Sequence, residues 1–347
     1  MWRIHFTADD LARTRISAGL GPLAETMWAM VLFRCPVQRP IAFGGWRDRA
    51  RGALTPEVRP GLRPLTLLMP RPAQMVDLLS LTGEQPTIED GLDALLTLPR
   101  DRLLTEMADL DRQCALPDGA WALAEPGPSR QSLARAAETA YRTLVEPYWP
   151  GISAQLKAEQ TARGRIMIDG GMERLLTTLY APRIRWQPPV LEVLVDGHAD
   201  LHLNGRGLIL APSVFVAEYP VLMFDLDESR AAPAVLAFPA AGDVSAGLRL
   251  WGRGEPAVGT LAALLGRTRA AALDRIADGC TTTELARQIS VSPAAASQHT
   301  TVLRDAGLIT TRRLGSAVLH TLTPLGADLL AGGLPGSGQP QLTDQAG

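Results

Sequence analysis

The sequence has little of several features that mark special classes of protein. Only three of its 347 residues are cysteine, at positions 35, 114 and 280, and 5% are aromatic. An odd number of widely spaced cysteines argues against a disulfide framework and for a reducing environment. Residues 1–20 lack the basic start and apolar run of a signal peptide. We therefore expect a cytoplasmic protein.

Long hydrophobic runs are also lacking. The most apolar stretch, residues 207–226, contains Pro212, Pro220 and two acidic residues. It therefore cannot be a membrane span, which needs roughly 20 apolar residues, and we expect no membrane association. Hydrophobic residues nonetheless make up 46% of the chain and charged residues 20%, values that are ordinary for a globular protein. These values exclude a collagen-like or wholly disordered chain.

The length predicts more than one folded unit, because single domains usually contain about 100–200 residues. We predict an α+β protein. Its N-terminal region, residues 1–250, is expected to be helical over 1–180 and β-rich over 190–240. A C-terminal domain is expected over 257–331. Residues 332–347 are rich in Gly, Pro, Ser and Gln and are expected to be disordered.

Local patterns predict several elements of the N-terminal region. Residues 2–6 are expected to be extended, and Thr7 to cap a short helix. Residues 23–33 carry apolar residues at helical spacing and predict a helix. Frequent proline and glycine predict loops over 36–72 and 117–128.

Residues 130–180 are expected to form a helical spine, interrupted where Pro147 and Pro150 remove backbone donors. Short apolar runs separated by turn residues make up the β-rich part. Because Asn and Gly accept positive φ, Asp196-Gly197 and Asn204-Gly205 are expected to be hairpin turns. We therefore predict a small antiparallel sheet.

Capping residues define successive helices in the C-terminal domain. Thr281 and Glu284 have the spacing of a capping box, in which each side chain bonds the other residue's backbone amide. Ser292 followed by Pro293 is a typical helix start, because serine accepts a bond from the first turn and proline at that position needs no partner. Gly307 is expected to end this helix.

A β-hairpin is expected to follow these helices. Two short helices joined by a tight turn form a helix-turn-helix. Residues 308–312 and 318–322, separated by Leu314-Gly315-Ser316, predict the two strands of the hairpin, and a closing helix is expected over 323–330. This order of elements predicts a winged helix-turn-helix.

The same domain contains a series of short motifs. They are Gly266-Arg267-Thr268-Arg269, Thr283-Glu284-Leu285-Ala286, Val291-Ser292-Pro293, Ser297-Gln298-His299, Val302-Leu303-Arg304-Asp305-Ala306-Gly307-Leu308-Ile309 and Leu322-Thr323-Pro324-Leu325-Gly326. As a set they resemble the ArsR/SmtB-type bacterial transcriptional regulators. The long N-terminal region is similar to that of an actinobacterial subgroup with a domain of unknown function. Thr300 departs from the family, which usually has a core leucine there.

The charge of the domain favours binding to double-stranded DNA. Residues 260–326 contain seven arginines and four acids, a local net charge of +3, whereas the whole chain carries −2. Attraction to phosphates supplies most of the affinity for DNA. Ser297, Gln298 and Thr301 are expected to face outward and read base edges, because glutamine can pair with adenine through two hydrogen bonds. Phosphate contacts are expected from Arg287, Arg304, Arg312 and Arg313.

The resemblance implies a homodimer on an inverted repeat, joined through the first and last helices of the domain. The leucines concerned are Leu261, Leu264, Leu265, Leu325 and Leu329. We expect a ligand-responsive repressor whose N-terminal region binds an apolar or aromatic effector. Tyr148 and Trp149, beside a helix break, are the expected lining residues. Two alternatives stay open: the N-terminal region is an enzyme, or it recruits a protein partner.

Signals for catalysis and metal binding are weak. The sequence has no nucleophile elbow, phosphate loop or metalloprotease helix, so we expect no enzyme and no cofactor; Gly19-Leu20-Gly21 is too short a match. Cys280 alone cannot replace the Cys-x-Cys pair of metal-sensing relatives, and no metal is expected.

Four acidic and histidine residues occupy alternate positions around the Asp196-Gly197 turn, and we expect them to be polar residues of a hairpin. They are Asp196, His198, Asp200 and His202. Cys35 and Cys114 are a redox pair or, as is commoner, buried thiols.

Overall fold

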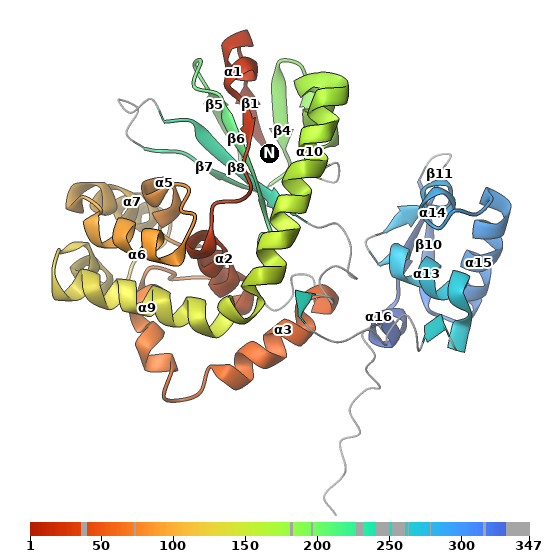
Figure 1. The fold of residues 1–347 in the computed structure, drawn as a ribbon, viewed down its shortest axis with the longest axis horizontal. Coiled ribbons are helices and arrows are strands. Elements are labelled where there is room, and N and C mark those ends of the chain that lie inside the picture. The colour runs from red at the N-terminus through yellow and green to blue at the C-terminus, as the bar shows by residue number, and fades with distance from the viewer. Residues whose placement is uncertain are drawn as a thin grey trace, which may run out of the picture. The chain divides into compact units, whose positions relative to one another are not determined.

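A computed structural model of the protein describes residues 1–35, 40–72, 74–180, 183–195, 197–226, 232–240, 250–251, 261–262, 264–277, 279–314 and 317–330. The chain divides into two compact units, each with helices and strands (Figure 1). The N-terminal unit comprises Met1–Pro40 and Trp46–Ala241, and the C-terminal unit comprises Ile41–Gly45 and Gly242–Gly347. The expected disordered tail, 332–347, lies outside the described residues.

Helices make up most of the N-terminal unit. They are α1 (Ala8–Arg13), α2 (Pro22–Arg34), α3 (Pro40–Ala53), α4 (Arg63–Leu67), α5 (Leu78–Thr82), α6 (Ile88–Thr97), α7 (Arg100–Gln113), α8 (Asp118–Trp121), α9 (Pro128–Leu144) and α10 (Trp149–Thr178). Short 3₁₀ turns occupy Arg59–Leu62, Ala122–Ala124 and Glu146–Tyr148. The expected cap is confirmed, because Thr7 and Asp10 form a capping box at the start of α1.

The loops predicted over 36–72 and 117–128 are wrong, because much of both segments is helical. α3 forms although it contains three glycines. Trp46 within it is fully buried, and its indole Nε1 donates a hydrogen bond to the Leu144 carbonyl at 2.9 Å. Burial of a large aromatic side chain contributes roughly 2–3 kcal/mol and offsets the loss of about 1 kcal/mol that each glycine causes.

The helical spine is confirmed as α9 and α10. The 3₁₀ turn Glu146–Tyr148 separates them, and Pro150 lies in the first turn of α10, where its missing N–H costs nothing. Gly171 has a φ of 72° and interrupts α10 near its C-terminal end. Glycine has no Cβ and adopts this positive φ without strain.

The strands described in the N-terminal unit form two four-stranded sheets. The first has the order β3-β4-β1-β5, with β1 (Trp2–His5), β3 (Ile184–Gln187), β4 (Val190–Val193) and β5 (Ala199–His202). The second has the order β2-β6-β8-β7, with β2 (Arg15–Ile16), β6 (Leu208–Ser213), β7 (Val221–Met223) and β8 (Ala234–Pro239). The predicted single antiparallel sheet is wrong, because β1·β5, β2·β6 and β6·β8 pair in parallel.

The two predicted hairpins are wrong as well. Asn204 and Gly205 do have positive φ, 54° and 79°, but the strands that flank this turn belong to different sheets. The strands on either side of Gly197 are separated by β1, which pairs with both of them. Asp196 lies outside the described residues. A strand from the N-terminus therefore takes the place that a local hairpin partner would occupy.

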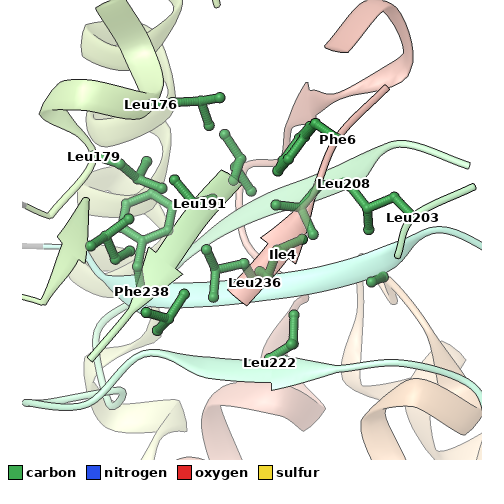
Figure 2. Packing of buried hydrophobic residues seen from close by; sticks show 14 of the residues in the cluster. Ile4, Phe6, Leu176, Leu179, Leu191, Leu203, Leu208, Leu222, Leu236 and Phe238 are labelled. Carbon is green, nitrogen blue, oxygen red and sulfur yellow. The ribbon is translucent and has the colours of Figure 1, made fainter. Parts of the chain in front are cut away.

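One apolar core joins the two sheets and the end of α10. Figure 2 shows Ile4 of β1 and Leu236 of β8 close together where the two sheets meet, and Leu176 of α10 above them in the same cluster. All three side chains are fully buried. Because successive strand residues point to opposite faces, burial of Ile4 places Arg3 and His5 on the other, polar face of their sheet.

The C-terminal unit consists of short helices and a three-stranded sheet. Its described elements are α13 (Arg267–Ile276), β9 (Cys280–Thr281), α14 (Thr282–Gln288), α15 (Pro293–Asp305), β10 (Ile309–Leu314), β11 (Ala317–Leu322) and α16 (Pro324–Leu330), and residues 261–262 and 264–265 are helical. The expected capping box of Thr281 and Glu284 and the cap by Ser292 are confirmed. The hairpin β10–β11 is confirmed too, whereas β9, which pairs with β11, was not expected.

No helix among the described residues combines the length and the apolar character that crossing a membrane would require.

Candidate nucleic-acid interface

α15 presents a polar face to solvent. Ser292 caps the helix by accepting a hydrogen bond from the Ala295 amide at 3.2 Å. Ala296 and Leu303 are buried on the inner side. Ser297 and Gln298 are exposed and Thr301 is half-buried, so the three residues expected to face outward lie on or beside the solvent-facing side.

Thr300 occupies a core position of α15. Its side chain is 4% exposed, and its hydroxyl donates to the Ser297 carbonyl at 3.0 Å. A buried hydroxyl without a partner would be destabilising. The bond to the Ser297 carbonyl removes this cost, so threonine can occupy a position where the resemblance leads us to expect leucine.

The four arginines expected at phosphates are all exposed. Arg287 lies in the last turn of α14, and Arg304 lies in the last turn of α15, where its guanidinium is 3.3 Å from the Asp305 carboxylate. Arg312 and Arg313 are consecutive residues of β10 and therefore point to opposite faces of the hairpin. The hairpin thus offers one cation on each face rather than a pair on one.

A buried histidine joins the hairpin to α14. His320 of β11 is 3% exposed, with Nε2 2.8 Å from the Thr282 hydroxyl and Nδ1 3.2 Å from the Thr311 hydroxyl. Burial, helped by the charge of Arg304, lowers the pKa of His320. The imidazole is therefore neutral at pH 7 and holds β10 and β11 in position against α14. Sequence reasoning missed this residue, because its partners lie in two other elements.

The five leucines expected at a dimer contact separate into two groups. Leu264 and Leu325 are 70% and 57% exposed. Leu261 is 5% exposed and belongs to the core of the C-terminal unit, and Leu265 and Leu329 pack against that core. Within this unit, therefore, Leu264 and Leu325 present the apolar surface of that set.

The N-terminal unit contains a cavity of about 160 Å³. Its lining residues are Leu201, Leu203, Arg206, Phe224, Asp225, Leu226, Ala232 and Ala234. Tyr148 and Trp149, the expected effector residues, are half-buried elsewhere and do not line it. The Trp149 ring instead meets Tyr141 edge-on, with centroids 6.5 Å apart.

Two buried glutamates have strongly raised pKa values. Burial raises the pKa of Glu25 to about 7, although its carboxylate accepts bonds from the amides of Val214 at 3.3 Å and Phe215 at 3.1 Å. Burial and nearby carboxylates, Asp77 foremost, raise the pKa of Glu106 to about 8. Perturbed carboxyls can mark catalytic sites, but neither of these lines the cavity described above.

Asp225 is the acidic residue at the cavity. Its carboxylate is 9% exposed and lies 2.8 Å from the Arg102 guanidinium. This ion pair fixes the position of the Asp225 carboxylate. The described lining residues of the cavity include no serine, cysteine, threonine or lysine that could act as a nucleophile.

The polar residues on β5 form a cluster with β1. Asp200 accepts a hydrogen bond from Arg3 at 3.1 Å and lies 2.8 Å from His5 Nε2. The rings of His5 and His202 stack with centroids 4.3 Å apart. These residues are not hairpin residues as expected, because β1 supplies their partners. Among the described side chains, no three acidic, histidine or cysteine residues are placed to hold a metal ion.

The glycines at 19 and 21 have a packing role. A Cβ at Gly21 would lie 1.6 Å from the Gln85 carbonyl oxygen, and one at Gly19 would lie 3.0 Å from Leu156. The segment 19–21 is therefore closed by the protein's own chain rather than open to a phosphate. Cys35, Cys114 and Cys280 are all buried.

Comparisons with family models, with curated proteins and with solved structures found no match to this chain.

Proposed function

We propose that the protein is a DNA-binding transcriptional regulator of the ArsR/SmtB type, with a C-terminal winged helix-turn-helix. In this proposal α14 and α15 are the helix-turn-helix, α15 is the recognition helix, and β10–β11 is the wing. The observation that carries the proposal is the exposure of Ser297 and Gln298 on a well-capped helix. Such a helix fits the major groove and can present its side chains to base edges.

The charges around α15 support this function. The four arginines expected at phosphates are exposed on α14 (Arg287), on the last turn of α15 itself (Arg304) and on β10 (Arg312 and Arg313). Arginines placed around uncharged polar side chains such as Ser297 and Gln298 can bind phosphates while those side chains contact bases. Sequence-specific DNA-binding domains typically use separate residues for phosphate contacts and for base contacts.

We propose further that the protein acts as a homodimer on an inverted repeat. Exposed Leu264 and Leu325 supply apolar surface for the dimer contact. A small effector, bound in the N-terminal unit, would release the repressor from DNA by favouring one dimer geometry over another. The cavity of about 160 Å³ supports a small, largely apolar effector; we propose it as the effector site in preference to Tyr148 and Trp149.

The direct test is selection of DNA from a random duplex pool by the purified full-length protein, with molar mass measured by light scattering. We expect a shared inverted repeat and a dimeric mass. A monomer that retains no duplex even at low salt would contradict the proposal.

Gln298→Ala is expected to weaken binding to the selected repeat by about 5- to 150-fold, because a bidentate contact to adenine contributes about 1–3 kcal/mol of discrimination. Binding to unrelated duplex should change little. Fluorescence anisotropy with both duplexes measures the two affinities. Gln288→Ala, which removes an exposed glutamine from α14, is the matched control. An equal reduction of affinity for both duplexes would remove Gln298 from the base-reading residues.

The double change Arg312→Ala with Arg313→Ala is expected to reduce the salt dependence of DNA binding. The slope of log K against log salt should fall by about 0.9 for each phosphate that the variant no longer neutralises. Titrations over a series of salt concentrations give the slope, and Arg135→Ala, an exposed arginine of α9, is the control. Because the two arginines point to opposite faces, the single variants show which of them binds a phosphate. An unchanged slope in the double variant would exclude the hairpin from the backbone contacts.

A further inference from the structure

The residues of α15 that point in the same direction as Gln298 form a row with an unusual composition for a helix face in water. At about 100° per residue, Ala294, Thr301, Val302 and Asp305 all lie within about 60° of Gln298 around the helix axis. Ala294 is exposed, and Val302 is 42% exposed. This row contains no lysine or arginine, and its one charged member is Asp305, which pairs with Arg304. Its exposed aliphatic members, Ala294 and Val302, are one turn away from Gln298 on either side.

Packing within the described part of the C-terminal unit does not account for Val302. It lies outside the apolar core of this unit, whose α15 members are Ala296 and Leu303. A β-branched residue is also a poorer helix former than alanine, so helix propensity does not explain an exposed valine in the last turn of α15. A single exposed aliphatic residue is common on protein surfaces. Val302, however, lies on the same side of α15 as Gln298, which is the side proposed to face the DNA bases.

We propose that Val302 contacts the C5-methyl group of a thymine in the DNA site, and so specifies thymine at one position of each half-site. This inference rests on the proposed DNA-binding function. The thymine methyl is the apolar group that a base edge presents in the major groove, and small aliphatic side chains recognise it by contact.

The distance along the helix places this thymine near the base read by Gln298. Four residues advance an α-helix by about 6 Å, and successive base pairs are separated by about 3.4 Å. The thymine should therefore lie within about two base pairs of the adenine whose recognition depends on Gln298. The exposed arginines lie outside this row, which leaves it free to contact bases.

The test removes the methyl group from the DNA. Each thymine of the selected repeat is replaced in turn by deoxyuridine, which lacks only that methyl, and the affinity of the full-length protein is measured by competition. At one position per half-site the affinity should fall about fourfold, the value for one methyl-sized apolar group removed from contact. Val302→Ala should bind the thymine and deoxyuridine duplexes equally at that position.

The variant is chosen so that folding does not obscure the result. Alanine is the best helix former, so Val302→Ala should keep the thermal stability of the parent. Ile168→Ala, which truncates an 81% exposed aliphatic residue in the N-terminal unit, should keep the fourfold preference for the methyl group.

Three results would overturn the inference, and they differ from one another. If selection returns no shared sequence, the proposed function fails and this inference fails with it. If a repeat is found but no thymine is sensitive to removal of its methyl, DNA binding stands and the methyl contact does not. If Val302→Ala remains as sensitive as the parent, another residue makes the contact.

Discussion

Arg130→Met is expected to lower the free energy of unfolding of the N-terminal unit by about 4 kcal/mol, because it leaves buried carbonyl groups without donors. Arg130 is 1% exposed and donates to four backbone carbonyls at 2.6–3.0 Å. The acceptors are Leu95, Leu98, Leu123 and Ala124. Each hydrogen bond from a charged donor contributes about 1.5–3 kcal/mol, but methionine also removes the cost of burying the guanidinium charge, so the net loss is smaller than the sum of four such bonds.

The position of these acceptors explains why a charged group is needed. Leu95 lies in the last turn of α6 and Leu98 is its C-cap, and α6 has no basic residue of its own in that turn. A cation near a helix C-terminus interacts favourably with the helix dipole. Arg130 supplies it from α9, so one side chain joins α6, the 3₁₀ turn at Ala122–Ala124 and α9.

Urea unfolding followed by tryptophan fluorescence measures this effect. Six of the seven tryptophans lie in the N-terminal unit, so the signal reports mainly on it. Arg135→Met, the same change at an exposed position of α9, is the control and should change stability by less than about 0.5 kcal/mol. Equal effects of the two changes would mean that the carbonyl contacts of Arg130 contribute nothing.

Glu25→Gln is expected to remove a pH-dependent decrease in stability. The Glu25 carboxyl is fully buried and has a pKa of about 7, against an ordinary value of 4.5. Between these values the unfolded chain has released this proton and the native state keeps it, so stability falls as the pH rises from 4.5 to 7. Integrated over this interval, the decrease is about 3 kcal/mol.

Unfolding free energies at a series of pH values, from about 4.5 to about 8, test this expectation. Glutamine stays neutral throughout, and its amide oxygen can still accept a bond from Val214 or Phe215. Other titrating groups, Glu106 among them, are present in both proteins, so the difference between the two profiles isolates Glu25. Glu173→Gln, an exposed position of α10, should keep the parent profile. Parallel profiles for Glu25→Gln and the parent would show that this carboxyl is not the cause.

Helix ends in the C-terminal unit were predicted well because their signals are local. The bonds that cap α14 and α15 join residues three apart, namely Thr281 with Glu284 and Ser292 with Ala295. Such a bond forms between neighbours whatever the rest of the chain does, and its spacing is visible in the sequence. The outward placement of Gln298 followed from the helical period for the same reason.

The sheets were predicted poorly because strand pairing is a long-range choice. The runs that became β4 to β8 were recognised as strands, but their partners were not. β1 pairs with β4 and β5, which follow it by almost 200 residues, and this pairing replaced the hairpin expected at Gly197. The hairpin expected at Asn204-Gly205 is absent because β5 and β6 belong to different sheets. Turn residues indicate where the chain bends, whereas neighbours in a sheet depend on which surfaces can be buried together.

Residues near one another in the chain were thus sufficient to define helix caps, the order of the helices and the hairpin from α14 onward, and the polar side of α15. Only the tertiary structure determined the two mixed sheets and the partners of the buried polar groups. Glu25 accepts from an amide 189 residues away, and His320 reaches Thr282 across 38 residues. Contacts of this kind depend on close packing between distant segments, and no spacing along the chain encodes them.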